Sequence, residues 1–160
     1  ALNSNPMIKS AQVYVHVNGH LVAEVEKKKP IARVENSVSY YIDEDGNFMP
    51  LSTNYTARVP LVTGNVSKTN LENVYKMAMK VKNDAFLSKH VTSIHQYKDM
   101  SISLRLRQCP FEVYVGGLAK LDKKINNLKV FYKKAFKEKI LSNYSKVNLQ
   151  FDSQVVCTKS

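Results

Sequence analysis

The four histidines are the first side chains to test for chemistry, because neutral imidazole binds zinc and serves as a general base. His16 and His20 flank an Asn18-Gly19 turn, while His90 and His95 lie around a predicted change from helix to strand. Neither pair has a carboxylate at a recognised ligand spacing. We therefore interpret all four as surface residues and predict neither a metal site nor a cofactor.

The acidic cluster and the cysteines give no stronger signal for a reaction. Asp43, Glu44 and Asp45 precede a glycine, but the twelve-position ligand pattern of a calcium loop is absent, so a turn is predicted. Cys109 and Cys157 match no metal spacing; they could pair in an oxidising compartment, but we favour two free thiols. No nucleophile elbow or phosphate-binding loop occurs. The sequence therefore predicts a protein that is not an enzyme.

The net charge of +11 leaves more than one interpretation open. It results from 24 basic and 13 acidic residues, and many lysines lie on the polar face of the longest predicted helix. A solvated surface is the simplest explanation, and proximity to an anionic membrane is a second. Arg105, Arg107, Phe111 and Tyr114 could also form a basic, aromatic sheet face of the kind that binds RNA. A basic nucleic-acid-binding module is therefore the alternative function.

The elements that would position these residues are mostly short strands. Asn18-Gly19 between two alternating runs is the strongest short-range signal for a β-hairpin. The apolar residues 59–64, closed by a glycine, are interpreted as a short segment without assigned structure. Alternating apolar and polar residues predict strands over residues 13–17, 21–25 and 101–107. Further short strands are predicted over residues 31–34, 38–42, 48–49, 91–97 and 111–115.

Two amphipathic helices are predicted from apolar residues that recur every three or four positions. The first covers about residues 70–83, with Thr69 as a possible N-cap and Glu72 at the capping-box spacing. The second covers about residues 118–141. Helices of this kind bury their apolar stripe on a sheet. The expected fold class is therefore α+β, a mostly antiparallel sheet with two amphipathic helices packed on it.

The C-terminal residues predict a final hairpin. Val147, Leu149 and Phe151 alternate with polar residues, Asp152-Ser153 supplies a turn, and residues 154–157 follow as a last strand. A last strand is often an edge strand, whose unpaired backbone groups can accept another strand. We expect the protein to act through this edge. Phe151 fits either the core or a partner contact at this point.

These segments, in this order, resemble a known family. Residues 5–15, Asn18-Gly19 and residues 21–25 resemble the end of a POTRA domain. The following segments resemble the bacterial FtsQ/DivIB family: residues 29–33, 41–46, 61–64 and 145–152. The resemblance implies two regions, an incomplete POTRA domain over residues 1–29 and an FtsQ-type β domain over residues 30–160.

The resemblance also implies a function and a location. Such proteins are non-enzymatic scaffolds of the bacterial divisome that bind FtsB-like and FtsL-like proteins and help control septal peptidoglycan synthesis. They are single-pass inner-membrane proteins, so this chain is expected to be a periplasmic fragment without its transmembrane helix. No nucleic-acid partner is implied. The resemblance implies partner contacts at Phe151 and Ser153, and more weakly at Gln150, Gln154 and Lys146. The position Val156 is added from the edge-strand prediction, because a proline there should block pairing.

Overall fold

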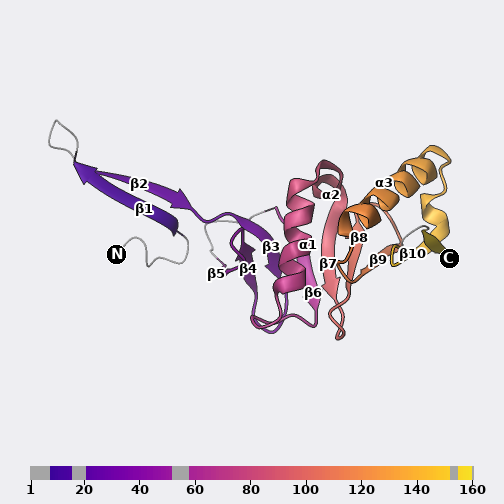
Figure 1. Ribbon diagram of the computed structural model, residues 1–160, viewed down its shortest axis with the longest axis horizontal. Helices are drawn as coiled ribbons and strands as arrows, with labels where there is room; N and C mark the ends of the chain where they lie inside the picture. Colours follow the sequence, from indigo (N-terminus) through magenta and orange to yellow (C-terminus); the bar gives the residue numbers. More distant parts are fainter. Residues whose placement is uncertain (1–7, 16–20, 52–57, 152–154, 160) are drawn as a thin grey trace.

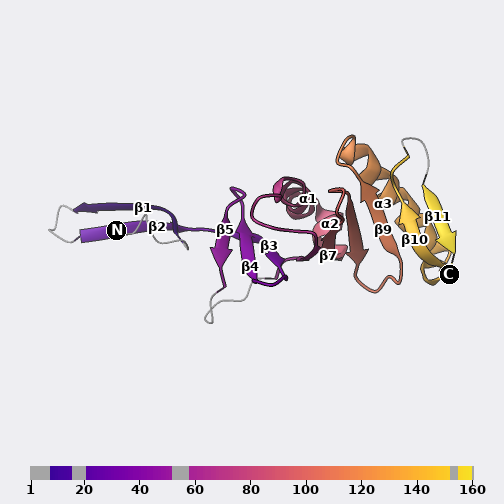
Figure 2. The same cartoon turned by 90° about the horizontal axis from the view of Figure 1, so that it is seen from below.

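The computed structural model describes residues 8–15, 21–51, 58–151 and 155–159. These residues form an α+β fold with two sheets, as expected. The first sheet is an antiparallel pair at one end of the molecule in Figures 1 and 2, made of β1 (Ile8–Val15) and β2 (Leu21–Lys27). The predicted hairpin is confirmed by this pairing, although its Asn18-Gly19 turn lies outside the described residues.

The second sheet has nine strands in the order β11-β10-β9-β8-β7-β6-β3-β4-β5. Five of its eight pairings are antiparallel, and three are parallel: β3 with β6, β6 with β7, and β9 with β10. The strands are β3 (Pro30–Val34), β4 (Tyr40–Asp43), β5 (Phe48–Pro50), β6 (Leu61–Gly64), β7 (Val91–Gln96), β8 (Ile102–Leu106), β9 (Glu112–Gly116), β10 (Tyr144–Asn148) and β11 (Val156–Lys159).

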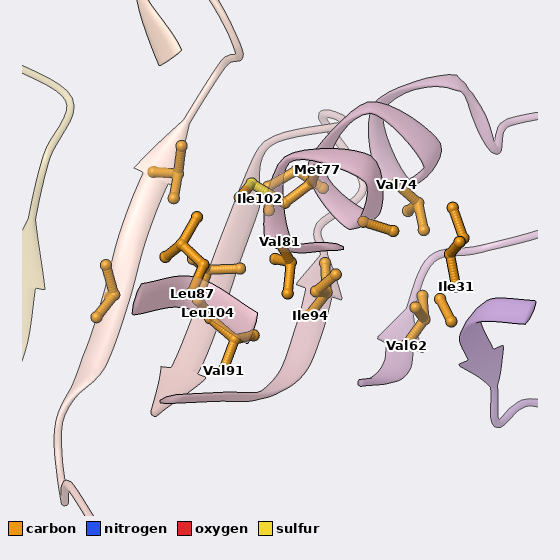
Figure 3. Packing of buried hydrophobic residues seen from close by; sticks show 14 of the residues in the cluster. Ile31, Val62, Val74, Met77, Val81, Leu87, Val91, Ile94, Ile102 and Leu104 are labelled. Carbon is orange, nitrogen blue, oxygen red and sulfur yellow. The ribbon is translucent and has the colours of Figure 1, made fainter. Parts of the chain in front are cut away.

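The helices lie on one face of the nine-stranded sheet (Figures 1 and 2). They are α1 (Glu72–Asn83), α2 (Ala85–His90) and α3 (Leu121–Lys137), followed by a 3-10 turn at Leu141–Asn143. Apolar residues of the helices meet the inward side chains of the strands, so that Met77 and Val81 of α1 pack near Ile94 and Leu104 (Figure 3). Burial of these side chains is what holds the two layers together.

Three details differ from the expectation. The apolar segment before residue 65 is a strand, β6, and it lies in the middle of the sheet between two parallel neighbours. The expected capping box is wrong, because α1 begins after Leu71 with no side-chain cap, and Thr69 hydrogen-bonds Ser67 instead. The final strands also shift, since β10 ends at Asn148 and β11 begins at Val156.

Candidate partner-binding edge

The strand β11 is one edge of the nine-stranded sheet. It pairs antiparallel with β10, with Val147 opposite Cys157 and Asn148 opposite Val156. In Figure 2 β11 lies at the end of the sheet, next to the C-terminus of the chain. Among the described residues no strand covers its other side. The backbone N–H and C=O groups of every second residue of β11 are therefore directed away from β10 and have no strand to pair with. This is the geometry that a partner strand requires.

The other edge strand, β5, is a poorer acceptor for a partner. It has three residues and ends in Pro50, which has no backbone N–H to donate. By contrast, β11 has four residues and no proline. Short strands and prolines are ordinary means of blocking an edge. The two edges therefore differ, and β11 is the more open one.

The side chains of β11 leave much of this edge accessible. Val156 is 40% exposed, and Thr158 and Lys159 are also exposed. Cys157 is half-buried against the core, where burial raises the pKa of its thiol. Cys109 is likewise half-buried with a raised thiol pKa, and both cysteines are free, as expected. Three of the four side chains of β11 are therefore accessible to a partner, and the fourth, Cys157, packs against the core.

The segment leading to β11 places Phe151 on the surface. Val147 and Leu149 are fully buried, whereas Phe151, which follows the end of β10, is 46% exposed. The sequence left open a core residue or a partner contact; the exposure of Phe151 argues against full burial in the core, and the partner contact stays a prediction. Gln150 is also exposed, and its backbone N–H donates to Asn148 Oδ1 at 2.8 Å. Two further candidates, Ser153 and Gln154, lie outside the described residues.

Lys146 connects this edge with the face of the sheet that carries no helix. Its ammonium lies 4.8 Å from the centroid of the Tyr114 ring on β9, a cation–π contact. The ring of Tyr114 lies 6.0 Å from that of Tyr97, which lies 4.6 Å from His95. These four side chains line an open groove of about 950 Å³ that runs from β6 to β10. The groove therefore adjoins the strand next to the edge.

Polar contacts hold the rings of this groove in place. The Tyr97 hydroxyl donates to Glu112, and burial together with this bond raises the pKa of Tyr97. Burial alone would raise the pKa of Glu112 as well. Hydrogen bonds from Tyr97 and Ser103 and the charges of Lys146 and Arg105 outweigh it, so the pKa lies below its ordinary value. Sequence reasoning missed this set of four groove side chains, because they come from different strands and only the register of the sheet brings them together.

The chemical sites weighed from the sequence are not assembled among the described residues. Phe111 is fully buried and packs against Phe131, so it cannot share an exposed RNA-binding face with Tyr114. The Asp43 carboxylate accepts hydrogen bonds from the backbone N–H groups of Asp45 and Asn47, each at 2.9 Å. The acidic cluster is therefore a turn, as predicted. Within the described ranges no group of three His, Cys, Asp or Glu side chains could hold a metal ion.

Comparison with known proteins gives a family. The family described as FtsQ/DivIB, C-terminal related, matches residues 29–158. The chain belongs to this family. A similar protein is the cell division protein FtsQ of Geotalea daltonii, which is 22% identical over 170 residues, covering 99% of this chain and 61% of that protein. The chain thus spans about three fifths of the length of this relative.

Membership confirms the resemblance to FtsQ/DivIB, a family of cell division proteins, while the POTRA resemblance of residues 5–25 lies before the matched range and stays a prediction. Because the match extends from residue 29 to residue 158, it includes the groove and all of the β11 edge except Lys159. Of the helices in the described part of the chain, none has the length and apolar character needed to cross a membrane.

Proposed function

We propose that this chain is the periplasmic part of a non-catalytic scaffold in bacterial cell division. It binds FtsB-like and FtsL-like proteins and helps control septal peptidoglycan synthesis. A single transmembrane helix outside the given sequence anchors it in the inner membrane. Residues 1–29 are the last part of a POTRA domain, and residues 30–160 form the β domain. The family match to residues 29–158 supports this proposal.

The observation that carries the proposal is the open edge of β11. A partner segment adds a strand there, with main-chain hydrogen bonds supplying affinity and side chains beside the edge supplying selectivity. Phe151 and Val156 are the apolar contacts, at 46% and 40% exposure, and Gln150 and Lys146 are polar contacts at the same end of the sheet. Ser153 and Gln154 are assigned to the same contact from the family resemblance.

A matched pair of phenylalanine variants tests the side-chain part of the proposal. Phe48 on β5 is 48% exposed and lies on the opposite edge strand, so it is a close control for Phe151. Since both side chains are half exposed, each alanine variant should cost about 1 kcal/mol of stability or less. Phe151→Ala should weaken binding of an FtsB-like segment by roughly thirtyfold, the loss of about 2 kcal/mol expected of a central contact. Phe48→Ala should leave binding unchanged.

A proline variant tests the backbone part. Val156→Pro removes the N–H of the residue that pairs with Asn148 on β10 and fixes φ, so it should disrupt β11 and with it strand addition, whichever side chains matter. Binding is measured by calorimetry, and folding by circular dichroism. A folded Val156→Pro chain that binds the partner normally would rule out the edge, as would equal losses for Phe151→Ala and Phe48→Ala.

A further inference from the structure

The helix α3 and its flanks carry most of the positive charge of the chain. Eight lysines and two acidic residues between positions 120 and 139 give this segment a net charge of +6, more than half of the total of +11. The acid at the start of the helix, Asp122, is already paired with Lys80 of α1 at 2.6 Å. Little negative charge therefore remains to balance the lysines of α3.

Not all of these lysines face solvent. Lys124 is buried and donates to the backbone carbonyls of Val115 and Gly117, and Lys129 is paired with Asp84 at 2.6 Å. The exposed ones are Lys123, Lys133, Lys134 and Lys137 on the helix and Lys139 just after it. Within the described residues, none of these five has a carboxylate at ion-pair distance. They form a dense array of unbalanced cations.

Two apolar side chains stand among these cations. Val130 is 70% exposed, the most exposed large apolar side chain in the described part of the chain, and Phe136 is 65% exposed. Val130 shares a helix face with Lys133, Lys134 and Lys137, because residues three, four and seven apart align on a helix. The Phe136 ring is stacked on Tyr132 at 6.1 Å between centroids, which holds it at the rim of this face.

We propose that this face of α3 docks on an anionic lipid bilayer. The lysine ammonium groups meet the lipid phosphates, and Val130 and Phe136 enter the boundary between headgroups and acyl chains. Apolar side chains inside a lysine array suit a bilayer better than a nucleic acid, whose phosphate backbone offers them no apolar phase. This surface lies in the helix layer, whereas β11 lies in the sheet layer (Figure 2). The proposal does not depend on the partner proposed for β11.

The test is flotation of the 160-residue chain with vesicles of phosphatidylcholine and phosphatidylglycerol in a ratio of 3:1 at low salt. Binding is expected on these vesicles, but not on pure phosphatidylcholine, and should weaken as salt is added. Lys133→Gln/Lys137→Gln should lower the partition coefficient roughly thirtyfold, since each lysine contributes on the order of 1 kcal/mol near an anionic surface. Lys29→Gln/Lys98→Gln has the same net charge at two exposed sites elsewhere and should bind nearly as the wild type does.

A valine pair tests insertion. Val130→Ser should weaken vesicle binding, whereas Val38→Ser, at a 65% exposed site outside α3, should not. Val156→Pro should bind vesicles normally, so a failure of the β11 edge remains distinguishable from a failure here. Equal binding to both kinds of vesicle, equal losses for the two lysine variants, or no effect of Val130→Ser would overturn the proposal. So would binding to a single-stranded oligonucleotide in place of the vesicles.

Discussion

Replacing Gly64 with alanine should be more damaging than the same substitution at Gly116, the last residue of β9, or at Gly117 just after it. Gly64 ends β6 opposite Gln96 with a φ of +95°, a region that favours glycine. A Cβ there would lie 2.3 Å from the Gln96 carbonyl oxygen and 2.7 Å from His95 Cε1. The carbonyl cannot easily retreat, because it accepts the Asn65 N–H at 2.8 Å. Both backbone strain and steric overlap therefore oppose the substitution.

Two other glycines separate these contributions. Gly116 has a φ of +75°, but the nearest atom to an added Cβ would be 3.5 Å away. Backbone strain, without steric overlap, therefore opposes its substitution by alanine. At Gly117 nothing lies within 4 Å, and no positive φ is present. Backbone strain from the alanine destabilises the fold by about 1–2 kcal/mol. The reduced flexibility of the unfolded chain stabilises the fold by about 0.4–1 kcal/mol. Overlap in a packed site adds about 1–3 kcal/mol.

The expected order of stability loss follows directly. Gly117→Ala should be neutral or slightly stabilising, Gly116→Ala should cost about 1 kcal/mol, and Gly64→Ala about 2–4 kcal/mol. Urea unfolding followed by tyrosine fluorescence measures all three, since the chain has nine Tyr and no Trp. If Gly64→Ala proves no more costly than Gly116→Ala, the close approach of β6 to β7 is wrong.

Three further predictions concern Lys124, Asp84 and the two cysteines. Lys124→Met should cost about 2–3 kcal/mol, because it removes charged hydrogen bonds to two backbone carbonyls at the end of β9; a urea midpoint close to that of the wild type would contradict this. Burial alone would raise the pKa of Asp84, but its bonds from Lys129 and the Leu87 N–H lower it overall. The ionised Asp84 therefore stabilises the fold at neutral pH, and this stability is lost as the pH falls through its lowered value. Asp84→Asn should lower the free energy of unfolding by about 1 kcal/mol at pH 7, a modest loss because Lys129 is partly exposed, and by nothing in strong acid. A loss of stability that does not depend on pH would contradict an ionised Asp84. Thiol titration of the denatured, unreduced chain should find the two free cysteines, and finding none would show a disulfide.

Alternation between a dry and a wetter face made β8 predictable from sequence. In β8, Ile102, Leu104 and Leu106 are buried while Arg105 is exposed, so alternation identified the strand and its orientation. The strand β6 gives no such signal. It has four residues, of which Val62 alone is fully buried, and its two parallel neighbours lie far away in the sequence. Nothing local distinguishes it from a loop.

The candidate site was predicted only in outline. Alternation over residues 147–151 and the turn after it indicated a last strand, and that strand is an edge, but Phe151 alternates with Leu149 as if it were buried. The strand ends before it, so the pattern no longer applies. The groove beside the edge depends on register, which brings Tyr97, at the end of β7, near Tyr114 of β9. Residues this far apart in sequence carry no mark of being neighbours.

Amide hydrogen exchange tests the central claim most directly. With an FtsB-like segment bound, the amides of Val156–Lys159 that point away from β10 should exchange more slowly, because each would donate to the added strand. The amides of β5, at the opposite edge of the same sheet, serve as the internal control and should not change. Slower exchange confined to β11 is the result that we expect. A bound partner that leaves β11 exchange unchanged would contradict strand addition at this edge.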